Sequence, residues 1–370
     1  MKYRLPYVAV TGRVKTFLDG APTLPVSCTT YVVKDYQGYL DSLKFTSYAL
    51  RHGAGVSLHI GELDLSDFPT ASPNVYFYLS KDHLDYEEFS QLPNVVSEPV
   101  GQVIQVYDSM MESIPGTVSI EDAWLLTHTF KSRDSYTIDL SLLRPKGKAN
   151  GRGLVASGPC SFALIFSNIL NVLAAPNKVI PIMRLYSRLN EVLRRGGIYK
   201  NGAIVIHCDI DSPLCLDFLS ATRADCPWAR MSLNLDKDCN PKDTLQKAIP
   251  LVRSGDLFLV KKVYDANGRR IYHNVCLEVL LPHRGTCLLT HVNLGSTPKS
   301  KIAKAFERGM KFLCLLHSRT GVDKDGVYLS PSQDRQVGLG VIGLANLLAF
   351  YQVKYKDFVH ALKLALDGVK

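Results

Sequence analysis

A short apolar run, Tyr272 to Pro282, most limits what this chain can fold into, because polar side chains occupy every second position in its middle. These are Asn274, Cys276 and Glu278. Successive side chains of a β-strand point to opposite faces, so a strand here would place all three on one face. One interpretation is a solvated edge strand whose cysteine fills the core. The other is a reactive site, since a carboxylate is rarely buried without a task.

Composition narrows the protein class. The chain has 370 residues, 46% hydrophobic and 21% charged, enough for one large domain or two ordinary ones. We expect a soluble, cytoplasmic protein, because there is neither an apolar run of ~18 residues nor a charged-then-apolar leader at residues 1–4. Nine scattered cysteines without a CxxC pair argue against a disulfide framework and a structural metal. The net charge of +9 is spread along the chain, which favours nucleotide phosphates over nucleic acid as the partner.

Apolar periodicity predicts alternating strands and helices, which is typical of the α/β class. Strands are expected over 30–33 and 204–207, and a further strand after the glycine turn at 53–55. The predicted helices cover residues 35–50, 162–192, 301–317 and 350–366.

Residues 66–135 match no motif and are rich in Pro, Ser and Asp. One amphipathic helix is predicted in them, with Val103, Val106, Met110 and Ile114 on its apolar face. We interpret this segment as an insertion. The domain prediction is therefore first strands in 1–65, an insertion in 66–135 and a continuation of the same domain in 136–370.

Several motifs together resemble one family, the catalytic (large) subunit of ribonucleotide reductase. The resemblance is nearest to the adenosylcobalamin-dependent class II, or to a small phage-type relative without the regulatory ATP-cone domain. It implies a ten-stranded α/β barrel that carries an insertion and is incomplete at its C-terminus. The motifs are Pro25-Val-Ser-Cys28, Gly53-Ala-Gly55, Ile138-Asp-Leu-Ser-Leu-Leu-Arg144, Leu154-Val-Ala-Ser-Gly-Pro159, Asn274-x-Cys-x-Glu278, Gly285-Thr-Cys287 and Arg335-Gln-Val-Gly-Leu-Gly340. The last of these, in the segment 335–345, resembles the start of a helix in the family.

The resemblance implies reduction of ribonucleotides to 2′-deoxyribonucleotides for DNA synthesis by a thiyl radical. Cys276 would carry the radical and take the 3′-hydrogen, which no ordinary side-chain base can remove. Glu278 would act as general base, and Asn274 would orient the sugar. Cys28 and Cys287 would supply the reducing electrons and close into a disulfide, which requires their Cα atoms to come within ~7 Å.

The same resemblance implies binding residues. Thr11, Ser27, Gly55 and Asn274 would contact the substrate, and an allosteric deoxynucleotide would bind at Asp35, Arg144, Arg194 and Arg195. The insertion could stand in for a neighbouring subunit at that effector site. The alternatives from local chemistry alone are turn or helix caps for Thr11, Ser27 and Asp35, a surface charge for Arg144 and a basic helix end for the arginine pair.

The expected partners follow from this chemistry. The reaction needs a radical initiator, either adenosylcobalamin or a metal-containing partner subunit, while the chain itself is expected to bind no metal. A thioredoxin- or glutaredoxin-type dithiol would reduce the disulfide. The Pro-x-Gly-x-x-Ser phosphate loop, the paired tyrosines and the C-terminal cysteine pair of complete reductases have no match in residues 1–370, so a complementary chain is a possible partner. The alternative function is a catalytically inactive, deoxynucleotide-binding regulatory fragment.

Overall fold

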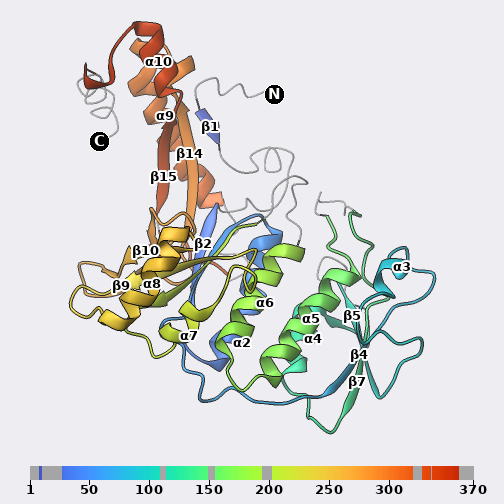
Figure 1. Ribbon diagram of the computed structural model, residues 1–370. Coiled ribbons are helices and arrows are strands. Elements are labelled where there is room, and N and C mark those ends of the chain that lie inside the picture. The colour runs from blue at the N-terminus through green and yellow to red at the C-terminus, as the bar shows by residue number, and fades with distance from the viewer. Residues whose placement is uncertain are drawn as a thin grey trace. The chain divides into compact units, whose positions relative to one another are not determined.

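The structure is a computed structural model whose described residues form two compact units (Figure 1). The terminal unit comprises Met1–Thr29 and Arg284–Lys370, and the central unit comprises Thr30–His283. Strand β2 (Cys28–Val32) passes from the first unit into the second. The described residues are 8–10, 27–108, 114–148, 155–193, 202–319, 327–334 and 336–357.

A parallel sheet forms the main layer of the central unit. In this sheet β3 pairs with β8, β8 with β9 and β9 with β10, all in parallel. Every residue of β3 and β8 is buried, which is typical of strands covered on both faces. The strands predicted after the glycine turn and at 204–207 are thereby confirmed. The strands are β3 (Gly55–His59), β8 (Ile204–Asp209), β9 (Arg230–Leu235) and β10 (Leu257–Lys261).

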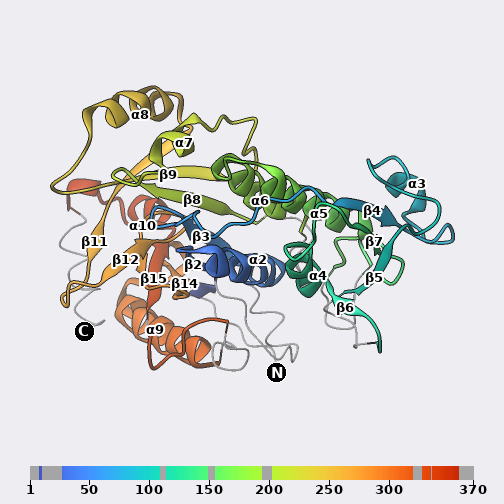
Figure 2. The same cartoon turned by 90° about the horizontal axis from the view of Figure 1, so that it is seen from below.

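A side-chain cap and a proline explain where helices of the central unit begin or end. The Asp35 carboxylate accepts a hydrogen bond from the Gly38 amide at 2.7 Å, so it caps α2 and confirms the helix predicted there. The helical stretch predicted over 162–192 is two helices, because Pro176 lies between them. Figure 2 shows α7 and α8 beside β8 and β9. The helices are α2 (Tyr36–Arg51), α5 (Pro159–Ala174), α6 (Val179–Val192), α7 (Cys215–Ser220) and α8 (Lys242–Ser254).

A second, smaller parallel sheet in the central unit has the strand order β4-β7-β5-β6. The amphipathic helix predicted from Val103 is wrong, because Val103 and Val106 lie in β5; Met110 of the predicted face is outside the described residues. Ile104 and Val106 are buried at a spacing of two, whereas Val103 is exposed. The elements are β4 (Asn74–Tyr78), α3 (Tyr86–Phe89), β5 (Gln102–Tyr107), β6 (Val118–Ser119), α4 (Ile120–Thr127) and β7 (Ser135–Asp139).

An antiparallel three-stranded ribbon completes the central unit. Strand β12 (Arg270–His273) pairs with β11 (Val263–Tyr264) on one side and with β13 (Leu280–Leu281) on the other. The segment between β12 and β13 is the one with alternating polar residues that the sequence singled out.

The terminal unit is built around β14 (Thr286–Asn293). This strand pairs with β1 (Val8–Val10) and with the start of β2 in antiparallel fashion, and with β15 (Val337–Ile342) in parallel. The glycine-rich segment expected to open a helix is thus a strand, and α10 (Leu344–Tyr351) follows it.

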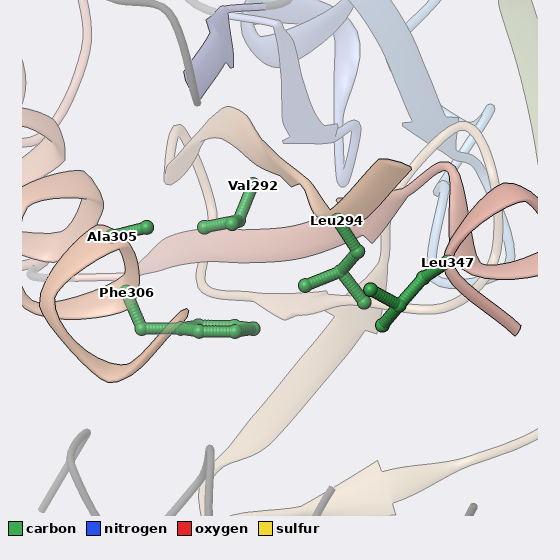
Figure 3. Close-up of a cluster of buried hydrophobic side chains, with 5 residues drawn as sticks. All are labelled: Val292, Leu294, Ala305, Phe306 and Leu347. Carbon is green, nitrogen blue, oxygen red and sulfur yellow. The ribbon is translucent and has the colours of Figure 1, made fainter. Parts of the chain in front are cut away.

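Helix α9 (Ile302–Arg319), predicted over 301–317, supplies much of the apolar core of the terminal unit. Figure 3 shows side chains of α9 near those of β14, the 3₁₀ turn η1 (Leu294–Ser296) and α10. A second 3₁₀ turn, η2 (Lys299–Lys301), precedes α9. Within the described ranges, no helix has the length and apolar character needed to cross a bilayer. The drawn cluster consists of Val292, Leu294, Ala305, Phe306 and Leu347.

Candidate functional site

The loop between β12 and β13 carries the three polar residues of the leading motif. The prediction of one continuous strand from Tyr272 to Pro282 is wrong, because the chain turns back here. Asn274 closes the turn: its backbone carbonyl accepts from the Leu277 amide at 3.2 Å, and its side-chain Oδ1 accepts from the Val279 amide at 3.1 Å. Leu277 has φ +73°, a conformation that turns allow and strands do not. Asparagine favours such turns because its side chain bonds nearby backbone amides.

The turn gives the three motif residues different environments. Asn274 is fully buried, whereas Cys276 and Glu278 are exposed. The Asn274 Nδ2 donates to Glu278 Oε1 at 3.1 Å, so the amide links the carboxylate to the base of the loop. The structure therefore brings Asn274 and Glu278 together, with Cys276 between them in the same short loop.

Strand β3 anchors this loop to the main sheet. The His273 carbonyl accepts hydrogen bonds from Ser57 Oγ at 2.6 Å and from His59 Nε2 at 3.1 Å. A Cβ added at Gly55 would lie 3.1 Å from Val275 Cγ2, so the predicted substrate glycine packs against the loop itself. Gly55, Ser57 and His59 are alternate residues of one strand and share one face. That face fixes the backbone on both sides of Asn274.

Two buried imidazoles lie beneath the ribbon. The rings of His59 and His207 stack with centroids 4.0 Å apart, and both side chains are buried. Burial lowers the pKa of His59 to about 3, although its hydrogen bond to the His273 carbonyl opposes the shift. Burial, followed by the neighbouring His59, lowers the pKa of His207 well below its usual value. Both rings are therefore neutral at physiological pH.

An ion pair connects the ribbon to the C-terminal end of β8. Arg270 of β12 donates from Nη2 to Asp209 Oδ1 at 3.0 Å and from Nη1 to Oδ2 at 3.2 Å. Asn234 Nδ2 also donates to Asp209 at 2.8 Å, and Asn234 Oδ1 faces His207 Nδ1 at 3.2 Å. This bidentate geometry holds β12 in place through charge-assisted bonds.

A pocket of about 480 Å³ opens beside the loop, within the central unit. Cys276 and its two neighbours form one wall. The other walls come from the starts of β8, β9 and β10, and they include Arg223, Arg230, Trp228 and Phe258. A volume of this size is in the range of small-molecule sites. The sequence analysis did not identify these four residues, because they belong to no motif and the strands that follow or contain them, β9 and β10, were not predicted.

The predicted redox cysteines lie opposite one another in the terminal unit. Cys28 on β2 is the register partner of Cys287 on β14, and they are 3% and 1% exposed. Directly opposed residues of antiparallel strands have Cα atoms ~4.5–5.5 Å apart, within the range that a disulfide spans. The Ser27 amide donates to the Cys287 carbonyl at 2.9 Å, which joins the predicted substrate serine to the same place.

A buried aspartate supports the cysteine pair. Asp334 is 4% exposed, and its Oδ2 accepts from the Thr286 amide, next to Cys287, at 2.8 Å. Burial raises the pKa of Asp334, while the bond from Thr286 works in the opposite direction. No motif pointed to Asp334 in the sequence.

The structure describes two of the four predicted effector residues, Asp35 and Arg144. Asp35 is exposed and caps α2, which is the local alternative considered for it. Arg144 Nη2 pairs with Asp108 Oδ2 at 3.1 Å, and the other oxygen of Asp108 pairs with Arg51 at 2.9 Å. Arg51 in turn bonds Glu121 at 2.8 Å. Arg144 therefore contacts the segment predicted as an insertion.

Three predicted site residues, Thr11, Arg194 and Arg195, lie outside the described residues. Among the residues that are described, no group of three His, Cys, Asp or Glu side chains could hold a metal ion.

The fold and the cysteine-bearing loop define a class, the α/β barrel of the reductase type. Residues 260–365 match the family model of the ribonucleotide reductase barrel domain, a range that contains the loop and Cys287. This part of the chain is therefore similar to the reductase barrel domain, in agreement with the resemblance of its motifs, and the α/β fold class is confirmed.

Two solved structures share this fold. A B12-dependent (class II) ribonucleotide reductase matches with a TM-score of 0.62 and 14% identity over 88% of this chain and 51% of its own length. The class Id ribonucleotide reductase alpha subunit of Actinobacillus ureae matches with a TM-score of 0.55 and 13% identity over 98% of this chain and 57% of its own length. The chain therefore spans about half the length of either structure. No curated protein matches it.

Proposed function

We propose that this chain carries the catalytic cysteine of a ribonucleotide reductase and acts in the cytoplasm. The observation that carries the proposal is the position of Cys276: an exposed thiol in an anchored loop, in the wall of a 480 Å³ pocket, with a carboxylate two residues away. An inactive regulatory fragment would have no need to hold a reactive thiol against such a pocket.

The proposed reaction assigns one role to each residue. A thiyl radical on Cys276 takes the 3′-hydrogen of the ribose, and Glu278 accepts the 3′-hydroxyl proton. Asn274 holds the Glu278 carboxylate by the bond at 3.1 Å. The 2′-hydroxyl leaves as water with a proton from the Cys28–Cys287 pair. The two thiols become a disulfide, and their two electrons and second hydrogen go to C2′. Glu278 returns its proton to the 3′-oxygen, and Cys276 finally returns its hydrogen to C3′.

The radical and the reducing electrons come from other molecules in this proposal. The initiator is either adenosylcobalamin or a metal-containing partner subunit. A thioredoxin- or glutaredoxin-type dithiol reduces the disulfide by exchange. Substrate contacts of Thr11, Ser27 and Gly55, and a deoxynucleotide effector at Asp35, Arg144, Arg194 and Arg195, remain part of the proposal.

The Cys276→Ser variant tests the central assignment. With a radical source, a dithiol and the remaining partners supplied, it should form no deoxynucleotide, because oxygen cannot replace sulfur as the radical carrier. Nucleotide binding and the far-UV circular dichroism spectrum should be retained. Cys314→Ser is the matched control, since Cys314 is also exposed but has no assigned role. Turnover by the Cys276→Ser variant would refute the proposal.

A further inference from the structure

The pocket beside Cys276 has two arginines in its wall. Arg223 and Arg230 are both exposed, and neither forms an ion pair with a carboxylate of the described residues. Elsewhere in the central unit the buried Arg51 and the half-buried Arg270 each have an acidic partner. Two cations without such partners in one cavity attract an anion, and the planar guanidinium group matches phosphate oxygens in particular.

The same pocket exposes aromatic surface. Trp228 is 38% exposed and Phe258 is 40% exposed, and both line the cavity. Aromatic faces that remain accessible in this way can stack with nucleobases, whose flat rings favour the contact. The combination of aromatic and cationic walls fits a nucleotide better than a purely apolar ligand.

A buried acceptor lies at the edge of the same pocket. Asn190 of α6 is 4% exposed and donates from Nδ2 to the Trp228 carbonyl at 2.6 Å. Its Oδ1 accepts no hydrogen bond from the residues that the structure describes. A buried carbonyl without a donor costs free energy, so a ligand that brings an N–H or O–H group to it gains that free energy on binding.

We propose that this pocket is the nucleotide subsite of the chain, with Arg223 and Arg230 binding the phosphates. The rings of Trp228 and Phe258 take the base, and Asn190 accepts a hydrogen bond from an amino or hydroxyl group of the ligand. The inference rests on the proposed function, which it extends by naming the residues that hold the substrate of Cys276.

Protection of Cys276 from alkylation reports on this pocket alone. The full chain is treated with iodoacetamide at increasing concentrations of CDP, ADP or cytidine, and the modified cysteines are measured by peptide mass spectrometry. A nucleotide in the pocket shields Cys276, whereas the exposed Cys239 and Cys314 serve as internal references. CDP or ADP should slow alkylation of Cys276 only, and cytidine should protect at higher concentration.

The Arg223→Ala/Arg230→Ala double variant then tests the phosphate assignment. It should raise the CDP or ADP concentration for half-protection by about tenfold or more and leave protection by cytidine unchanged. Arg308→Ala, which removes an exposed arginine of α9, is the control and should change neither. Unchanged nucleotide protection in the double variant, or equal protection of the wild type by cytidine and CDP, would overturn the inference while the proposed function stood. Failure of every nucleotide to protect wild-type Cys276 would overturn both.

Discussion

Acid should lower the stability of the fold through the stacked imidazoles of His59 and His207, beneath the loop between β12 and β13. His59 has a pKa of about 3 in the folded chain because it is buried, against 6.5 for an ordinary histidine. The unfolded chain therefore binds more protons below pH 6.5, and stability falls as the pH decreases toward the folded pKa. Between pH 6.5 and 4.5 the loss is about 2.3 kcal/mol for one such histidine. His207 is shifted in the same direction and adds to the loss.

Urea unfolding at several pH values between 7.5 and 4.5 measures this effect. The His59→Gln variant retains a donor near the His273 carbonyl but cannot titrate. Its free energy of unfolding should therefore fall less steeply with acid than that of the wild type, by up to about 1.4 kcal/mol per pH unit. Equal slopes for the two proteins over this range would show that His59 is not held neutral in the folded state, and the reasoning would be wrong.

Three further predictions concern the redox pair, a buried charge and the loop. One turnover without external reductant should join Cys28 to Cys287, and peptide mapping that recovers both as thiols after a demonstrated turnover would contradict the pairing. Asp108→Asn should lower the free energy of unfolding in urea by about 3–5 kcal/mol, because the buried Arg51 and the half-buried Arg144 lose their shared, buried carboxylate. Gly55→Ala places a methyl group 3.1 Å from Val275, so kcat should fall on the order of tenfold while thermal stability changes little; unchanged kcat would exclude this coupling.

Local signals in the sequence predicted several elements well. The helix after Asp35 depends on a cap and an apolar period within its own residues, and α2 forms there. The period of α9 likewise lies within one segment. The motifs alone also predicted that Cys28 and Cys287 form a pair. The register of β2 and β14 places these two residues opposite each other.

Elements that depend on distant contacts were less predictable. Gly338 and Gly340 look like a helix start, yet they lie in β15, where added Cβ atoms would be 2.3 Å from Leu289 and 2.8 Å from His291 on β14. The glycines permit close packing of two strands, which local sequence cannot reveal. The pocket arginines gave no signal for a similar reason: Arg223 and Arg230 matter only because the fold places them beside Cys276.

The cysteine-bearing turn combines both kinds of information. Its alternating polar residues resemble a strand, whereas the bonds of Asn274 to its neighbours, and that of the His273 ring to the Leu277 carbonyl, favour a turn. What fixes the turn comes from β3, more than 200 residues earlier, where Ser57 and His59 bond the His273 carbonyl. Because alternate residues of β3 all face the loop, the position of the Cys276 thiol depends on the completed sheet. The glycine motif at residues 53–55 therefore supports the cysteine-bearing loop, since Gly55 leaves the space that Val275 occupies.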